Sequence, residues 1–257
     1  MRMKIYRFKH SGKTAYGILK EERLFPVEGS IFRSFMVRSE GIDIAETLLL
    51  PPVMPSKIVA VGRNYREHAA ERGRPVPKEP LLFLKPPSAV IGPHDIIIYP
   101  EMSKRVDYEG ELAVVLKKKM SQLSDEDDVF AYILGYTCLN DVTARDLQDK
   151  DGQWSRAKGF DTFAPIGPCI STDLDPSGLK LKTFLNGKLK QSGNTRKFIF
   201  PIPVLLRHIS RIMTLYPGDI VTTGTPAGIG PMADGDRVDV QIEGIGTLSN
   251  TVMKVKH

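Results

Sequence analysis

Hydrophobic and polar residues alternate in short stretches along much of the chain, and this pattern predicts half-buried β-strands. Near the start, residues 4–9 alternate, residues 10–13 form a polar turn, and residues 14–19 follow as a second strand. The Asn186-Gly187 pair is a favoured hairpin turn, and residues 237–256 are typical of two further strands. The pattern therefore predicts hairpins at both ends of the chain.

Runs rich in apolar residues predict the remaining strands. Residues 105–117 and 131–141 are the strongest candidates for central strands. Residues 57–62 predict a compact buried strand, and residues 81–85 and 220–223 predict shorter ones.

Two segments favour helices. Residues 63–72 are compatible with a helix that ends at Gly73, and residues 203–214 form the best helix of the second half, with Pro203 near its first turn. Because strands outnumber helices, the chain is predicted to have a β-rich α+β fold.

A proline-rich joint at residues 48–55 indicates a domain boundary. We therefore expect a small N-terminal domain over residues 1–54 and a larger domain over residues 55–257. The chain shows no internal repeat.

Composition narrows the class of protein. Among 257 residues, 41% are hydrophobic and 26% are charged, which is typical of a globular protein and excludes bulk disorder. No apolar run is long enough to predict a membrane helix, and the net charge of +6 is too scattered to predict a nucleic-acid partner. With only Cys138 and Cys169, the sequence predicts no disulfide framework and a cytoplasmic protein.

Three acidic residues alternate in one predicted strand. Asp107, Glu109 and Glu111 would project from the same face, where unpaired carboxylates repel one another. A hard divalent cation with oxygen ligands would relieve this repulsion. The alternative is a solvent-facing acidic edge paired with lysines.

Asp141 could supply a further carboxylate, because it ends a predicted buried strand. Together with Glu109 and Glu111 it would suit Mg²⁺ or Mn²⁺. The alternative is that Asp141 or Thr143 caps a helix that follows.

A second group of polar residues suggests proton transfer. His68 and Glu71 are three residues apart, so on a helix they would share one face, and the carboxylate could orient the imidazole as a base. Lys85 and Lys158 stand in apolar or glycine-rich settings where they could hold a carboxylate or an enolate oxygen. The alternatives are an incidental surface ion pair and lysines that reach solvent along their stems.

The order of these motifs resembles the fumarylacetoacetate hydrolase family. The resemblance rests on six segments in sequence, Gly62-Arg63-Asn64-Tyr65 with His68 and Glu71, Phe83-Leu84-Lys85-Pro86, Tyr108-Glu109-Gly110-Glu111-Leu112, residues 140–146, Lys158-Gly159-Phe160-Asp161 and residues 224–230. It implies a catalytic domain built as a rolled β-sandwich, a small N-terminal β domain and a homodimer.

The resemblance also implies roles for single residues. Glu109, Glu111 and Asp141 would hold Mg²⁺ or Mn²⁺, with His68 and Glu71 as a catalytic dyad on a mobile lid. It further implies a catalytic Lys158 and four substrate-binding residues, namely Arg63, Lys85, Gln148 and Thr225.

The activity predicted first is hydrolysis of a C–C bond in an acylpyruvate-type 2-oxo acid through a metal-bound enolate. The dyad favours hydrolysis because it provides a base for water. The alternative is an isomerase or decarboxylase acting on 2-hydroxymuconate-type diacids, or on oxaloacetate, in the breakdown of aromatic compounds.

Overall fold

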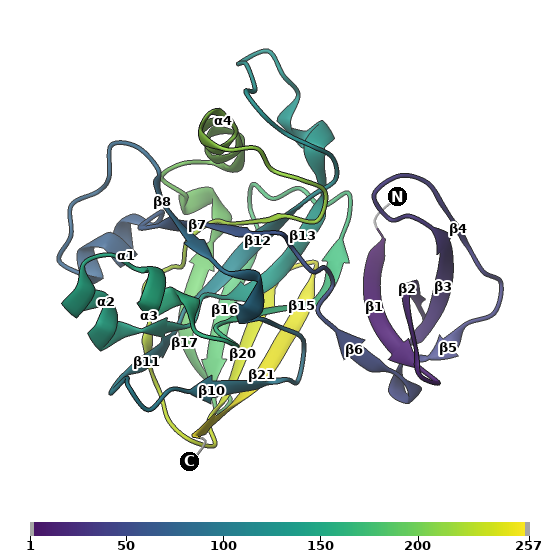
Figure 1. The fold of residues 1–257 in the computed structure, drawn as a ribbon, viewed down its shortest axis with the longest axis horizontal. Coiled ribbons are helices and arrows are strands. Elements are labelled where there is room, and N and C mark those ends of the chain that lie inside the picture. The colour runs from purple at the N-terminus through teal and green to yellow at the C-terminus, as the bar shows by residue number, and fades with distance from the viewer. Residues whose placement is uncertain (1–2, 255–257) are drawn as a thin grey trace.

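A computed structural model describes residues 3–254 of the chain. Its first part consists of short strands, β1 (Lys4–His10), β2 (Lys13–Lys20), β3 (Arg23–Gly29), β4 (Phe35–Val37), β5 (Ile42–Asp43) and β6 (Leu48–Leu50). They form a lobe at the right of Figure 1. The predicted N-terminal hairpin is confirmed, with Phe8 paired to Ala15 across β1 and β2.

The largest sheet joins this lobe to the rest of the chain, because β1 pairs with β15 (Ala164–Ser171). Its main path runs β4-β3-β2-β1-β15-β13-β12-β18-β7-β8. The later strands are β7 (Ile58–Gly62), β8 (Leu81–Lys85), β9 (Val90–Ile91), β12 (Gly110–Leu116), β13 (Ile133–Asn140) and β18 (Ile220–Thr222). The apolar runs thus form the central strands, as predicted.

A second sheet packs against the first and closes the main core (Figure 1). It contains β10 (Ile96–Tyr99), β16 (Lys180–Leu185), β17 (Lys188–Asn194), β20 (Arg237–Ile242) and β21 (Gly246–Lys254). The predicted hairpin turn is confirmed, since Asn186 and Gly187 connect β16 to β17 with φ of 51° and 75°. The two predicted C-terminal strands are β20 and β21, while residues 255 and 256 lie outside the described part.

The predicted single strand at 105–117 is wrong in one respect. It breaks at Glu109 into β11 (Val106–Tyr108) and β12. β11 belongs to a separate small sheet with β14 (Thr143–Ala144) and β19 (Gly230–Met232), whereas β12 lies in the centre of the largest sheet. Beyond the break the predicted alternation holds, because Leu112 and Val114 join one hydrophobic core and Ala113 and Val115 join another.

The helices are short, and three of them, α1 to α3, lie close together at one side of the molecule (Figure 1). They are α1 (Arg66–Glu71), α2 (Arg145–Asp151), α3 (Ser155–Gly159) and α4 (Ile202–Ile212), with 3₁₀ turns at Ile44–Glu46, Pro87–Ala89, Val129–Tyr132 and Thr195–Lys197. The helix predicted over residues 63–72 forms as α1, but its predicted start at residue 63 is wrong. Arg63 has φ of +56°, a left-handed conformation that a helix cannot include. Among residues 3–254, no helix has the length and apolar character needed to cross a membrane.

Candidate active site

Three buried carboxylates meet where the strands of two sheets separate. Glu109 occupies the break between β11 and β12, Glu111 lies on β12, and Asp141 directly follows β13. Asp141 donates its backbone N–H to the carbonyl of Glu109 at 2.8 Å, which holds the end of β13 beside the break. These three residues, hereafter the acidic trio, each offer an oxygen within 4.8 Å of the others.

The structure excludes both alternatives considered from sequence. Glu109, Glu111 and Asp141 are 4%, 2% and 1% exposed, so they do not form a solvent-facing edge. Neither Asp141 nor Thr143 caps the next helix, because the N-cap residue of α2 is Ala144, which makes no side-chain cap. Asp107 stands apart from the acidic trio and is held by the guanidinium groups of Arg105 and Arg145.

Three buried cations, hereafter the inner cations, contact the acidic trio. They are Lys85, Arg145 and Lys158. The Lys158 ammonium lies 2.8 Å from Glu109 and 2.5 Å from Asp141. Lys85 approaches Asp141 at 2.6 Å, and Arg145 donates a short hydrogen bond to Glu109. Because unpaired buried charges are costly, this pairing allows Glu109 and Asp141 to share one interior site with the three cations.

The carboxylates differ in their electrostatic environment. Burial acts to raise the pKa of Glu109, but the positive charges around it, Lys158 foremost, hold that pKa well below its usual range. Glu111 has no ion pair among residues 3–254, and burial together with the neighbouring carboxylates raises its pKa well above the usual range. Glu111 is therefore the member of the acidic trio that most needs a further cation.

The residues present fit a Mg²⁺ or Mn²⁺ ion. All three donors are hard carboxylate oxygens, which these ions prefer, and they lie close together in a buried position that opens into the cavity. Glu111 is also oriented by the backbone N–H of Gly224, which donates to it at 2.7 Å. A second interaction that fixes a ligand in this way is typical of metal sites.

The predicted dyad forms on α1. His68 Nδ1 lies 3.2 Å from a Glu71 oxygen, and the other Glu71 oxygen accepts the backbone N–H of Gly228 at 2.9 Å. Burial lowers the pKa of His68, which keeps the ring neutral near pH 7 despite the adjacent carboxylates. Since Nδ1 faces Glu71, Nε2 is the nitrogen left to exchange a proton.

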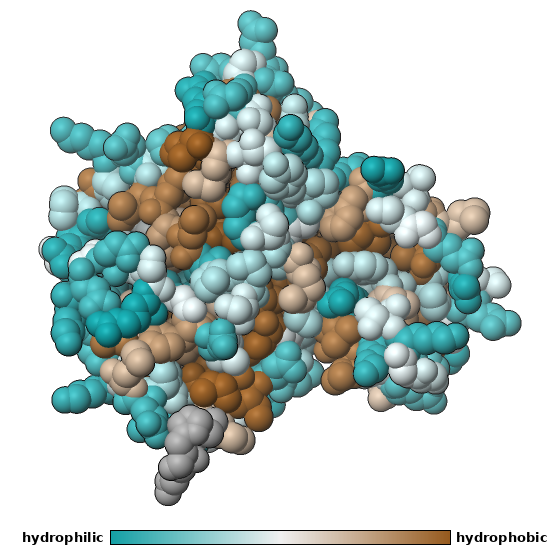
Figure 2. All heavy atoms as spheres, viewed as in Figure 1, coloured by the Kyte–Doolittle hydropathy of each residue, from teal (hydrophilic) through white to brown (hydrophobic). Residues whose placement is uncertain are grey.

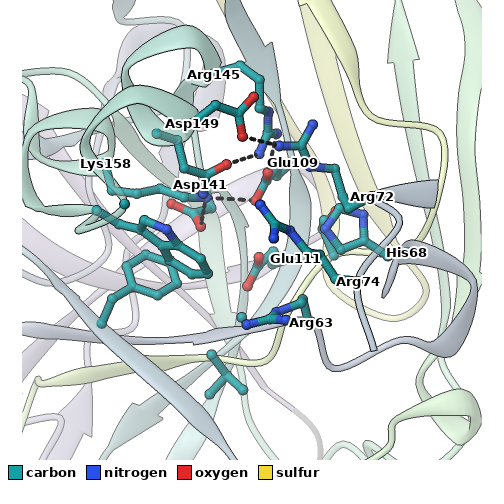
Figure 3. Close-up of a pocket in the computed structure, with 17 residues that line it drawn as sticks. Arg63, His68, Arg72, Arg74, Glu109, Glu111, Asp141, Arg145, Asp149 and Lys158 are labelled. Atoms are coloured by element: carbon teal, nitrogen blue, oxygen red, sulfur yellow. Dashed lines mark hydrogen bonds and ion pairs between the residues drawn. The ribbon is translucent and has the colours of Figure 1, made fainter. Parts of the chain in front are cut away.

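His68 and the acidic trio line one cavity of about 320 Å³ (Figure 3). Phe83 and Trp154 form an aromatic wall, with ring centroids 5.1 Å apart in an edge-to-face arrangement. Figure 2 shows mainly hydrophilic side chains over the region of α1 to α3, the helices that surround the cavity. The cavity thus combines one apolar wall with a strongly charged floor.

The four predicted substrate-binding residues have different positions. Arg63, Gln148 and Thr225 line the cavity. Lys85 does not, and its buried ammonium contacts Asp141 and the carbonyl of Lys158 instead. Lys85 therefore balances the charge of Asp141 and does not face the cavity.

Sequence reasoning missed Arg145 and Gln191. Arg145 joins Asp107, Glu109 and Gln148, and only its place directly after the Asp141 motif could have indicated this. Gln191 is fully buried and donates to the hydroxyl of Thr225 at 2.8 Å, although it comes from β17 in the other sheet. No local pattern signals such a contact.

Comparisons with known proteins identify the family of this chain. The family model described as "Fumarylacetoacetate (FAA) hydrolase C-terminal" matches residues 57–253, and the model described as "Rv2993c-like, N-terminal" matches residues 3–52. This chain therefore belongs to the fumarylacetoacetate hydrolase family, and its α+β fold with an N-terminal β unit is that of the family.

Three similar proteins illustrate the range of the family. A protein of Archaeoglobus fulgidus is 56% identical over 239 residues, covering 90% of this chain and 95% of its own. The mitochondrial oxaloacetate tautomerase Fahd2a of Rattus norvegicus is 43% identical, covering 80% and 69%. The crystal structure of 2-hydroxyhepta-2,4-diene-1,7-dioate isomerase from Mycobacterium marinum has 40% identity and a TM-score of 0.92, covering 99% and 100%.

Proposed function

We propose that this chain is a Mg²⁺- or Mn²⁺-dependent enzyme that hydrolyses a C–C bond in acylpyruvate-type 2-oxo acids. The observation that carries the proposal is the shared cavity, which is lined by both His68 and the acidic trio, with Glu71 holding His68 from behind. A base and a site for a 2-oxo acid are the two components that this reaction requires.

His68, Glu71 and Lys158 have separate roles in the proposed reaction. Glu71 holds Nδ1 of His68, so Nε2 of the neutral ring can take a proton from water that attacks the distal carbonyl. Lys158, whose pKa is raised by the carboxylates beside it in opposition to burial, stays charged and stabilises negative charge on the 2-oxo oxygen. When bound by the acidic trio, the divalent ion would supply Lewis-acid polarisation of the 2-oxo acid.

A second candidate is proton transfer without hydrolysis, as in an isomerase or tautomerase of 2-oxo diacids. The same His68 would then move a proton between two atoms of the substrate. The M. marinum and R. norvegicus relatives, which are named as an isomerase and a tautomerase, favour this candidate. Decarboxylation of such diacids remains a third use of the same site.

The deciding experiment measures products. Purified protein is incubated with Mg²⁺ and acetylpyruvate, and pyruvate release is followed with lactate dehydrogenase and NADH. We expect release by the wild type and by His208→Gln on α4, and loss of release by His68→Gln. Absence of pyruvate, together with an ultraviolet change on oxaloacetate or a 2-hydroxymuconate-type diene, would reverse the order of the candidates.

Three wider predictions accompany the proposal. A domain division after residue 54 is supported by the separate family matches at 3–52 and 57–253. A homodimer and a cytoplasmic location stay predictions, which sedimentation and cell fractionation would test.

A further inference from the structure

Gln191 connects two parts of the candidate active site from the opposite sheet. It lies on β17, its side chain is fully buried, and both polar atoms of its amide are hydrogen-bonded. Oε1 accepts the backbone N–H of Gly110 at 3.0 Å, whereas Nε2 donates to the Thr225 hydroxyl at 2.8 Å and to the carbonyl of Pro226 at 2.7 Å. Gly110 stands between two members of the acidic trio, and Thr225 lines the cavity. One amide therefore contacts both the segment that carries the trio and the cavity wall.

The neighbours of this amide determine which way it points. A backbone N–H can only donate and a carbonyl can only accept, so Gly110 requires the amide oxygen and Pro226 requires the amide nitrogen. The second N–H of the amide then donates to the Thr225 hydroxyl, which donates its own hydrogen to the carbonyl of Gly110 at 2.8 Å. Gln191, Thr225 and Gly110 thus form a closed ring of hydrogen bonds.

The ring fixes what the Thr225 hydroxyl can offer to a ligand. A hydroxyl has one hydrogen and two acceptor positions. The hydrogen is donated to Gly110, and one acceptor position receives the N–H of Gln191. The position that is left can receive a hydrogen bond from an O–H group in the cavity. Thr225 cannot donate to a carboxylate or a 2-oxo oxygen unless the ring breaks.

Close packing holds the loop that carries Thr225 against β17. A Cβ atom on Gly193 would lie 2.8 Å from the Pro226 side chain, and a Cβ atom on Gly228 would lie 2.2 Å from the carbonyl of Lys190. Both distances are too short for a real side chain, so the loop and the strand approach each other only because glycine stands at both positions. The loop therefore depends on β17 for its place, and Gln191 supplies the polar part of the contact.

We propose that Gln191 is a positioning residue, which holds the Thr225 hydroxyl at the cavity wall as an acceptor for an O–H group of the ligand. The inference rests on the proposed function, because this O–H group would belong to the 2-oxo acid in its enol form or to a water molecule of the reaction. Gln191 does not line the cavity, so it acts through Thr225. Loss of Gln191 should therefore have the functional effect of losing the hydroxyl, and no further effect when both are removed.

A matched pair of ligands measures the acceptor directly. Lactate carries an O–H group on its second carbon, whereas pyruvate carries there an oxo oxygen that can only accept. Both are titrated by calorimetry with Mg²⁺ present, each enantiomer of lactate separately. The ratio of the pyruvate Kd to the lactate Kd is then compared between variants, so that differences in chelation cancel. We expect this ratio to fall about threefold to tenfold in Thr225→Val, as for the loss of one hydrogen bond, and to stay near the wild-type value in Thr225→Ser.

Gln191→Met removes the amide and nearly keeps the volume of the side chain. The ratio should fall by a similar factor in this variant, and the double variant Gln191→Met/Thr225→Val should fall no further. If thermal unfolding shows that Gln191→Met is not folded, Gln191→Glu replaces it with the same expected shift, because the carboxylate still accepts the N–H of Gly110 and lacks only the donors. Gln241→Met is the control, since Gln241 is exposed on β20 of the same sheet and does not line the cavity.

Turnover distinguishes the two sources of the O–H group, and it is measured on the substrate that the product assay identifies. If Thr225 holds water, the ligand ratio should stay unchanged, while kcat should fall equally in Thr225→Val, Gln191→Met and the double variant. Effects that multiply in the double variant, or an unchanged ratio together with unchanged turnover in Thr225→Val, would overturn the inference. A shifted ratio without pyruvate release from acetylpyruvate would retain the inference and reject hydrolysis.

Discussion

Replacement of Glu111 by glutamine tests the proposed metal-binding role of the acidic trio separately from its contribution to folding. Glutamine keeps the size of the side chain and an oxygen that can accept the N–H of Gly224. Glu111 has no ion pair among the described residues, so the change leaves no buried cation without a partner. Since burial and its acidic neighbours raise the pKa of Glu111, its charge opposes folding above the usual pKa of a glutamate. We therefore expect metal-free Glu111→Gln to be at least as stable as the wild type.

The Glu111→Gln variant should become less stable than the wild type when Mg²⁺ is added. At a Mg²⁺ concentration of one hundred times the wild-type Kd, binding stabilises the folded state by about 2.7 kcal/mol. Removal of one of the three charged ligands in the acidic trio should weaken binding by a factor of roughly 100 or more, above the loss typical of a residue that only orients a ligand. At the same concentration the variant would then gain about 0.4 kcal/mol or less. The difference of about 2.3 kcal/mol corresponds to a Tm difference of roughly 5–9 °C.

The assay is thermal unfolding with and without Mg²⁺, accompanied by calorimetric titration of the metal. Protein dialysed against a chelator provides the metal-free reference. Glu126→Gln is the control, because Glu126 is exposed and remote from the cavity. A wild-type rise in Tm that persists in Glu111→Gln, or an unchanged Mg²⁺ affinity, would refute the assignment of Glu111 as a ligand.

Further predictions concern the neighbours of this site and one structural carboxylate. Glu109→Gln should destabilise the metal-free protein by about 3–5 kcal/mol in urea unfolding, because it removes a buried negative charge that pairs with both Lys158 and Arg145. The lowered pKa of His68 should keep kcat/KM constant as pH falls until below about 6.5, and Glu71→Gln should move the inflection lower still, because Glu71 acts to raise that pKa. Asp219→Asn should cost about 2–3 kcal/mol at pH 7, since this buried carboxylate pairs with the Lys57 ammonium at 2.6 Å and accepts hydrogen bonds from four further N–H or O–H groups. Its pKa is lowered in the folded state, so the difference from wild type should shrink as pH falls below about 4, and an unchanged difference there would contradict the ion-pair explanation.

Much of the strand arrangement could be predicted from local patterns. The apolar run of β12 and the alternation after Glu111 place Leu112 and Val114 on one face, as the separate cores confirm. The hairpin at Asn186 was predictable because its left-handed backbone favours asparagine followed by glycine. The start of α1 was not, because nothing in the local pattern showed that Arg63 adopts a left-handed conformation between the strand and the helix.

The limits of local reasoning are clearest around Glu109. Alternation placed Asp107 with Glu109 on one strand face, but the chain changes sheets at Glu109. Such a change depends on which strands are available as partners, and β11 finds its partners in β14 and β19, far along the sequence. Asp107 consequently pairs with arginines while Glu109 joins the acidic trio.

The sequence by itself determined the β-rich class, the candidate carboxylates and the His68–Glu71 spacing, because each depends on residues close together in the chain. The tertiary arrangement was needed to show that Lys85 contacts Asp141, that Gln191 reaches Thr225 from the other sheet, and that Arg74 lines the cavity with no ion pair to any residue in the range 3–254. The physical reason is that the charge balance of a buried site depends on which groups the fold brings together. Lys85 and Asp141 are 56 residues apart in the chain and Gln191 and Thr225 are 34 apart, so local spacing carries no information about their distance in space.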